Sequence, residues 1–340
     1  MTGPAAPARF SLRVNNDLGV AELTALARAA EEFGFDQLWV SNDLFLRSAP
    51  ALIGVLAART SRIRLGIAVM NPYSVHVVEL AMAAATLQEA SGGRFALGIG
   101  AGAAEFLGWA GMDRPAPLAT TRQAVAALRT LLGHHDVDPA LLPAWMDPPR
   151  PLGVPLGAPV PVYVGGMGPR MLRMAGEHAD GALPLLYPPE HYPVARHQVR
   201  QGLAAAGRAG TAFDLPACFW VSISPDAGAA RAALANKLAY YGPSISATLL
   251  AGAGLVPEDF APAAALAQRG EDASALVDDR MLALGVAGDA DDVIARCRGL
   301  QAAGARHLSF GPPLGPDPLA AVRLLGERVL PALRTTGGVA

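Results

Sequence analysis

The sequence is poor in cysteine and in charge. Its two cysteines, Cys218 and Cys297, are too few for a disulfide framework and lack the spacing of metal ligands, so we expect two buried free thiols. Charged residues make up 16% of the 340 positions, the formal net charge is −2, and no block of like charge occurs. This balance argues against nucleic acid or an anionic membrane surface as the main partner.

Long apolar runs and the signatures of metal or nucleophile chemistry are also missing. No stretch reaches the roughly 18 uninterrupted apolar residues of a membrane-spanning helix, and Met1 to Arg9 lacks the basic and apolar regions of an export signal. The seven histidines form no HExxH, HxH or Cys/His cluster. A GxSxG elbow and a Walker loop are absent too. We therefore expect a cytoplasmic protein without a metal site.

Apolar runs alternating with helical patterns fill the chain instead. Hydrophobic residues make up 52% of the sequence, which indicates a large buried core, and the alternation is typical of parallel βαβ units. Strands are expected over Phe10–Val14, Gln37–Ser41, Arg64–Met70, Arg94–Gly98, Val162–Val164, Ala182–Leu185, Ala217–Ser224 and His307–Phe310. Helices are expected over Ala21–Phe33, Pro50–Thr60, Val77–Ala90, Thr120–Leu132, Arg170–His178, Glu190–Ala205 and Pro318–Leu333.

Eight such strands predict an α/β protein with the (β/α)8 (TIM) barrel fold, as a single domain over residues 1–340. Two excursions, at about 134–159 and 240–279, exceed a minimal barrel. We expect both to be insertions on the loops at the carboxyl ends of the strands, where barrels place lids and substrate pockets. A doubly wound open sheet is the alternative, but no GxGxxG opens the first helix, and eight units in series suit closure better.

A glycine-rich loop, Gly165-Gly166-Met167-Gly168, stands between the fifth expected strand and the following helix. Glycines let backbone N–H groups approach an anion closely, and the amino end of a helix adds partial positive charge. A phosphate site is the functional interpretation. The alternative is a tight turn that needs positive φ, which explains one glycine easily but three poorly. A phosphate site without a nucleophile or metal signature points to a cofactor that brings its own reactivity.

Polar residues and a second glycine cluster follow three other strands, where barrel enzymes place their chemistry. Asn42 and Asp43 come after the second strand and are candidates to contact a ring system, although both residue types also cap helices and turns. Asn71 follows the third strand, directly before a proline. Gly98 to Gly102 follows the fourth strand, which suits backbone packed against a flat ligand or a flexible loop.

These residues also carry a family resemblance. The segments FGFDQLWVSNDLF, RIRLGIAVMNPYSVH, GGRFALGIGAG, PVYVGGMGPRMLRMAGEHADGAL and HLSFGPPLGPDP stand in the order and spacing of the luciferase-like flavin- and F420-dependent oxidoreductases. The chain most resembles the branch of F420-dependent methylenetetrahydromethanopterin reductases, over about residues 10–333. The resemblance implies a (β/α)8 barrel with a flavin or deazaflavin ring in its mouth and subunits paired as a homodimer.

The resemblance also implies roles for individual residues. A non-proline cis peptide, placed by position at Ala68-Val69, backs the ring, and Gly165, Gly166, Met167 and Gly168 hold the phosphate. Further cofactor contacts are implied for Asn71, Ala101 and Gly102. Asp43, with Asn42 beside it, is the candidate proton donor. The implied activity is hydride transfer between reduced or oxidised F420 and a small organic substrate.

Two departures from the family pattern leave alternatives open. Asn42-Asp43 stands where family members often have Asp-His, and the segment from Asn71 to His76 lacks the usual arginine. The first departure keeps open an FMN-dependent monooxygenase that receives reduced flavin from a separate reductase. It also keeps open an inactive flavin-binding homologue. The second predicts a substrate other than methylenetetrahydromethanopterin.

Overall fold

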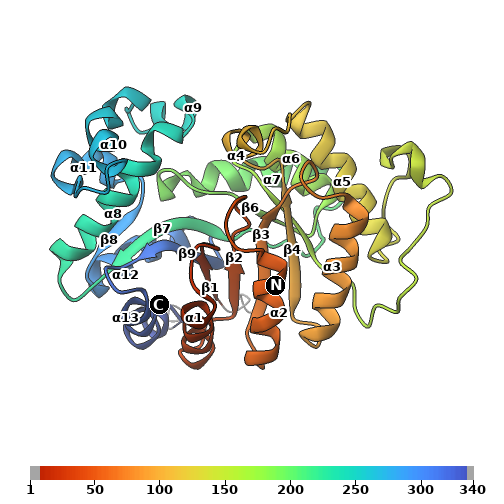
Figure 1. Ribbon diagram of the computed structural model, residues 1–340, viewed down its shortest axis with the longest axis horizontal. Helices are drawn as coiled ribbons and strands as arrows, with labels where there is room; N and C mark the ends of the chain where they lie inside the picture. Colours follow the sequence, from red (N-terminus) through yellow and green to blue (C-terminus); the bar gives the residue numbers. More distant parts are fainter. Residues whose placement is uncertain (1–7, 335–340) are drawn as a thin grey trace.

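A curled sheet of parallel strands forms the centre of the protein in a computed structural model, which describes residues 8–334 (Figure 1). Within that range the sheet has nine strands in the order β6-β5-β4-β3-β2-β1-β9-β7-β8. The strands are β1 (Arg9–Val14), β2 (Gln37–Val40), β3 (Arg64–Met70), β4 (Phe95–Gly100), β5 (Val162–Gly165), β6 (Gly181–Leu183), β7 (Ala217–Ile223), β8 (Val286–Gly288) and β9 (His307–Leu314).

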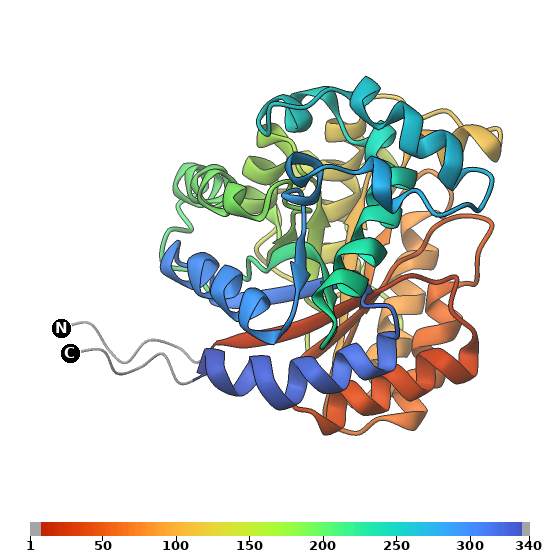
Figure 2. The same ribbon diagram turned by 90° about the vertical axis from the view of Figure 1, so that its left-hand side faces the viewer.

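Helices cover the outer face of this sheet, and α1, α2 and α3 stand beside β1 to β4 in Figure 1. The longer helices are α1 (Val20–Glu32), α2 (Ala49–Arg59), α3 (Val77–Ala90), α5 (Pro117–Leu131), α6 (Pro169–His178), α7 (Tyr192–Ala205), α8 (Ala227–Tyr241) and α12 (Ala290–Ala302). The shorter ones are α4 (Ala104–Trp109), α9 (Ala247–Ala251), α10 (Ala261–Ala267), α11 (Asp279–Leu282), α13 (Pro318–Leu324) and α14 (Leu330–Arg334). Figure 2 shows the last helical segment lying beside α1, so the two ends of the described chain pack together. Within residues 8–334, no helix is both long and apolar enough to cross a bilayer.

The sheet continues from β6 to β7 through isolated bridges rather than a full ladder. Gly181 pairs with Asp214, and Leu185 pairs with Cys218. The backbone N–H of Leu186 donates to the Cys218 carbonyl at 2.8 Å. Because β7 also pairs with β9, and β9 with β1, these contacts bring the sheet back on itself.

Side chains alternate between two apolar environments because successive residues of a strand point to opposite faces. In β1, Phe10 and Leu12 join the large core between sheet and helices. The inner face carries a separate cluster of Trp39, Ala96, Tyr163, Leu183 and Cys218. Both faces of each strand are thereby covered, which accounts for the nearly continuous apolar runs in the sequence.

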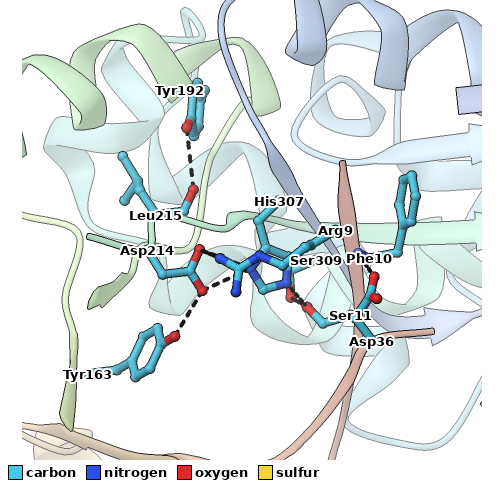
Figure 3. A network of polar contacts seen from close by, with 10 residues as sticks. All are labelled: Arg9, Phe10, Ser11, Asp36, Tyr163, Tyr192, Asp214, Leu215, His307 and Ser309. Atoms are coloured by element: carbon cyan, nitrogen blue, oxygen red, sulfur yellow. Dashed lines mark hydrogen bonds and ion pairs between the residues drawn. The ribbon is translucent and has the colours of Figure 1, made fainter. Parts of the chain in front are cut away.

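A buried polar network occupies the inner face at the amino ends of the strands (Figure 3). The Asp214 carboxylate accepts a hydrogen bond from the Tyr163 hydroxyl at 2.9 Å and pairs with the Arg9 guanidinium. Nδ1 of His307 lies 3.0 Å from the same carboxylate, and its Nε2 lies 2.9 Å from the Ser11 hydroxyl. Burial alone would raise the pKa of Asp214, but His307, Arg9 and Tyr163 outweigh it and hold the pKa below its usual range. The network joins β1, β5 and β9 to the segment before β7.

Several expected elements differ from the structure. The fourth strand runs to Gly100 and the last to Leu314, so both extend beyond their predicted ends. The strand Val286–Gly288 and the helices Ala227–Tyr241 and Ala290–Ala302 are present but were not predicted. These segments are short or rich in alanine, so their apolar period is weak. Residues 1–7 and 335–340 of the predicted 1–340 domain, including most of the segment Met1 to Arg9, lie outside the described residues.

The two predicted excursions enter the fold differently. Residues 240–279 follow α8 and contain α9 and α10, before β8 pairs with the carboxyl half of β7. Residues 134–159 instead join the end of α5 to the start of β5, so the prediction of a carboxyl-end loop is wrong for their connection. Helix α5 already occupies the crossover that follows β4. Trp145 of this segment contacts His76, which follows β3, with ring centroids 5.2 Å apart.

Replacing Asp214 by asparagine should destabilise the fold by about 2 kcal/mol at pH 7, because a neutral amide replaces the buried carboxylate that accepts from Tyr163 and pairs with Arg9. Denaturant unfolding measures the change. Asp279→Asn is the control, since Asp279 pairs with Arg231 while 89% exposed, and an exposed pair contributes little. Equal stability of the two variants would contradict a structural role for the network.

Candidate active site

The glycine loop follows β5 and leads directly into α6, as the sequence predicts. None of its three glycines has positive φ, so a strained turn does not account for them. A Cβ on Gly165 would lie 2.5 Å from Cγ1 of Val69, and one on Gly166 would lie 2.4 Å from Cγ of Met171. Internal packing therefore explains Gly165 and Gly166.

Packing within the protein does not explain why position 168 is a glycine. A Cβ there would meet no protein atom within 4 Å, and its φ of −73° suits any residue. Among the described residues, the N–H groups of Met167 and Gly168 have no acceptor. Both residues are exposed, and they precede the ten-residue helix α6. The loop thus offers free donors and open space for an anion at the amino end of a helix.

The Ala68-Val69 peptide bond is cis, which confirms the prediction from the family resemblance. It lies at the carboxyl end of β3, where the pairing with β4 shifts register between Ile67 and Met70. The Val69 side chain packs against bare backbone. A Cβ on Gly98 would lie 3.2 Å from one of its methyl groups, and one on Gly100 would lie 3.0 Å from the other. The glycines at 98 and 100 belong to β4, so their positions reflect this contact rather than loop flexibility.

Asn71 and Gly102 lie close to each other at the carboxyl ends of β3 and β4, where Val69 packs against the glycine backbone. A Cβ on Gly102 would be 3.2 Å from Cβ of Asn71, and Gly102 has a φ of +70°. Oδ1 of Asn71 accepts from the N–H groups of Tyr73 and Ser74 at 3.1 and 2.9 Å, so this oxygen shapes the loop after β3. Ala101 is half-buried next to Gly102. The structure therefore brings the predicted contacts after β3, β4 and β5 into one region.

Asn42 and Asp43 follow β2 and have different surroundings. Oδ1 of Asn42 accepts from the N–H of Ala49 at 3.1 Å, so it caps the start of α2. Asp43 is held by Asn16, whose Oδ1 accepts from the Asp43 N–H at 3.2 Å, and by the Ser41 hydroxyl, which donates to its carboxylate at 3.1 Å. Burial raises the pKa of the Asp43 carboxyl, although the Ser41 hydrogen bond and the charge of Lys237 oppose it.

Charged residues that sequence reasoning missed lie on the same side of the sheet. Arg13 is on β1 and Lys237 on α8, and the charge of Arg13 is close enough to lower the pKa of Lys237. Two sequence signals could have revealed them. Arg13 interrupts an apolar strand on its inner face, and Lys237 is the only lysine among 340 residues. Within residues 8–334, no group of three or more His, Cys, Asp or Glu side chains is arranged to hold a metal ion.

Known proteins resemble this chain over nearly its whole length. The 5,10-methylenetetrahydromethanopterin reductase of Archaeoglobus fulgidus is 32% identical over 335 residues, which cover 96% of this chain and 100% of that protein. The F420-dependent glucose-6-phosphate dehydrogenase of Nakamurella multipartita is 29% identical and covered to 99%, as is this chain. The structure of the coenzyme F420-dependent tetrahydromethanopterin reductase from Methanopyrus kandleri matches with a TM-score of 0.83 at 25% identity, over 96% of this chain and 100% of that one.

The sequence profile described as luciferase-like monooxygenase matches residues 2–307. This match spans well over half of the chain and agrees with the relatives above. The chain belongs to the luciferase-like monooxygenase family.

Proposed function

We propose that this protein is an F420-dependent oxidoreductase that transfers a hydride between the deazaflavin and a small organic substrate. The similarity to F420-dependent enzymes over 96% or more of the chain supports this assignment. The departure at Asn71 to His76 favours a substrate other than methylenetetrahydromethanopterin.

The observation that carries the proposal is the open loop before α6. Its free N–H groups at Met167 and Gly168, together with the helix amino end, fit a cofactor phosphate. Gly165 and Gly166 let this loop pass closely over Val69 and Met171. The loop thereby fixes the phosphate at a definite distance from the wall formed by β3, β4 and β5.

The wall beside Val69 fits a flat ring, because glycine backbone on β4 and β5 supports a single β-branched side chain there. Ala68, Asn71, Ala101 and Gly102 complete this side of the proposed ring site. When bound, F420 supplies two-electron hydride chemistry. The protein's part is to hold ring and substrate in reacting geometry, which alone contributes a large share of rate acceleration.

Asp43 is the proposed proton donor. Its burial favours the neutral carboxyl, which has a proton to give, and Asn16 and Ser41 fix its position. Asn42 acts through the start of α2 that it caps, and is a positioning residue in this proposal. An FMN-dependent monooxygenase with a separate reductase is the second candidate. It is favoured only by the presence of Asn42-Asp43 at the positions where family members often have Asp-His.

The finer architecture belongs to the same proposal. Strands β1 to β7 and β9 form a (β/α)8 barrel as a single domain, and β8 belongs to the insertion that follows α8. The bridges of Asp214 and Leu185 support closure between β6 and β7. The family resemblance further implies a homodimer, and the cytoplasmic location expected from the sequence belongs to the same proposal; both stay predictions.

Gly168→Asp should weaken F420 binding at least tenfold, because it places a carboxylate beside the free N–H groups without disturbing a protein contact. Gly153→Asp is the control, since Gly153 is also exposed and open. Titration of apoprotein with F420 and with FMN, followed by calorimetry, measures both effects. Tighter binding of FMN than of F420 would contradict the F420 assignment, and unchanged affinity in Gly168→Asp would remove the phosphate site.

Asp43→Asn should raise the melting temperature more at pH 8 than at pH 4. The raised pKa of Asp43 means that the neutral form stabilises the fold at low pH, and this stability is lost as pH rises through that pKa. Asparagine stays neutral at every pH and avoids the loss. Thermal unfolding across this range tests the expectation. A gain that is the same at both pH values would show that Asp43 titrates as an ordinary exposed carboxyl.

A further inference from the structure

Arg13 lies on the inner face of the sheet, near its carboxyl end. Strand alternation puts Ser11 on the inner face, where it contacts Ser309 and His307, and Arg13 follows two residues later on the same face. Its Nη2 donates to the Phe219 carbonyl at 2.8 Å. Its Nε is buried without an acceptor. No carboxylate within residues 8–334 lies at ion-pair distance from the guanidinium.

The neighbouring strand, β9, leaves room for this guanidinium. Gly311 pairs with Trp220 across β9 and β7, and a Cβ on Gly311 would lie 2.3 Å from Nη2 of Arg13. Any side chain at position 311 would therefore displace the charged group. The FGPPLGPDP segment thus keeps space for a cation inside the mouth.

Lys237 belongs to α8, which contacts β7 and lies to its left in Figure 1. Its Nζ lies 4.9 Å from the ring centroid of Trp220 and 4.4 Å from that of Tyr241. No described carboxylate forms an ion pair with it. Burial lowers the pKa of Lys237 to about 8; Asp17 and Asp43 oppose this change, and the charge of Arg13 adds to it.

Two cations thus lie against neighbouring residues of β7, Arg13 on the Phe219 carbonyl and Lys237 over the Trp220 ring, and no described carboxylate is in ion-pair contact with either. Partly buried like charges are costly unless an opposite charge compensates them. A guanidinium offers a planar fork of donors and an ammonium offers a point charge, and both suit oxyanions. The aromatic rings of Tyr187, Trp220 and Tyr241 line the same region, with Tyr187 and Trp220 centroids 5.1 Å apart.

We propose that Arg13 and Lys237 form an oxyanion subsite that binds a carboxylate or phosphate group of the substrate. That the bound anion belongs to a substrate rests on the proposed function, whereas the binding of an anion at Arg13 and Lys237 does not. The cofactor phosphate is a different group, because three strands separate β1 from β5 along the sheet. The aromatic lining indicates that the anion is attached to an apolar body.

The single lysine makes the test specific. Protein labelled with ¹³C-lysine gives a single set of side-chain NMR signals, which come from Lys237. The pH at the midpoint of the change in their chemical shift is measured in apoprotein. Inorganic phosphate and benzoate are the two probes, with ionic strength held constant by chloride. A bound anion stabilises the charged lysine, so the midpoint should rise by about one pH unit, a tenfold preference for the cation. Phosphate at the Met167–Gly168 loop does not contact Lys237 and leaves this signal unchanged.

Variants locate the subsite. Arg13→Met should abolish the anion-induced rise, and Arg13→Gln tests the same point if the methionine variant does not fold. Lys237→Met should weaken binding of the effective probe at least tenfold by calorimetry, whereas Lys237→Arg retains it. Arg231→Met is the matched control on α8, because Arg231 is exposed and paired with Asp279.

Each outcome separates the possibilities. A rise with benzoate alone assigns carboxylate substrates, a rise with phosphate alone assigns phosphate esters, and a rise with both supports a general oxyanion site. No rise with either probe, or a rise that survives loss of Arg13, overturns the subsite. Because the measurement uses apoprotein, an anion effect without F420 binding would refute the proposed function and keep the subsite. F420 binding without an anion effect would support the proposed function and refute the subsite.

Discussion

The buried Asp214 carboxylate connects strands that lie far apart along the curled sheet. The backbone of Asp214 pairs with Gly181 at the edge of β6, and its N–H donates to the Asp180 carbonyl. Its side chain reaches β5, β1 and β9 through Tyr163, Arg9 and His307 (Figure 3). One residue thus links the two strands that lack a continuous ladder to the rest of the inner face. A buried charge of this kind specifies an arrangement because few alternatives satisfy all of its partners. With the amino end held in this way, the carboxyl ends of the strands are free to carry loops of very different length.

The sequence predicts the parts of this fold that repeat a strong local pattern. Long apolar strands such as Arg64–Met70 and the helices that follow them were found with small errors at their ends, because both faces of each strand are covered. Val286–Gly288 was missed, since three residues carry no period. Helix α8 was missed because it is rich in alanine and its apolar residues are spread almost evenly around its axis. The origin of residues 134–159 was misplaced because length alone does not show which end of a strand an excursion meets.

In the candidate site, too, some features were predictable from the sequence and others were not. Backbone features were predictable, since Gly165 to Gly168 and the cis bond at Ala68-Val69 carry family-specific sequence around them. Side-chain roles were less so. Asn42 and Asn71 are polar residues at strand ends, yet each has an oxygen engaged by nearby backbone N–H groups. Such local hydrogen bonding is what these residue types do most often. Lys237 is far from β1 in sequence, so only the tertiary fold reveals its proximity to Arg13.

The segment between β7 and β8 has a geometry that bears on how this protein could diversify. Ile223 pairs with Gly288, so the ends of the segment are one strand spacing, about 5 Å, apart. Between them lies a separate apolar cluster that includes Leu234, Leu250 and Phe260. Most of this cluster comes from the segment itself, and Tyr187 and Trp220 join it from outside. A segment with adjacent ends can be exchanged between homologues without altering the path of the flanking strands. Recombination at these two residues would replace the aromatic and basic lining supplied by α8 in one step, while the glycine loop and the polar network stay untouched.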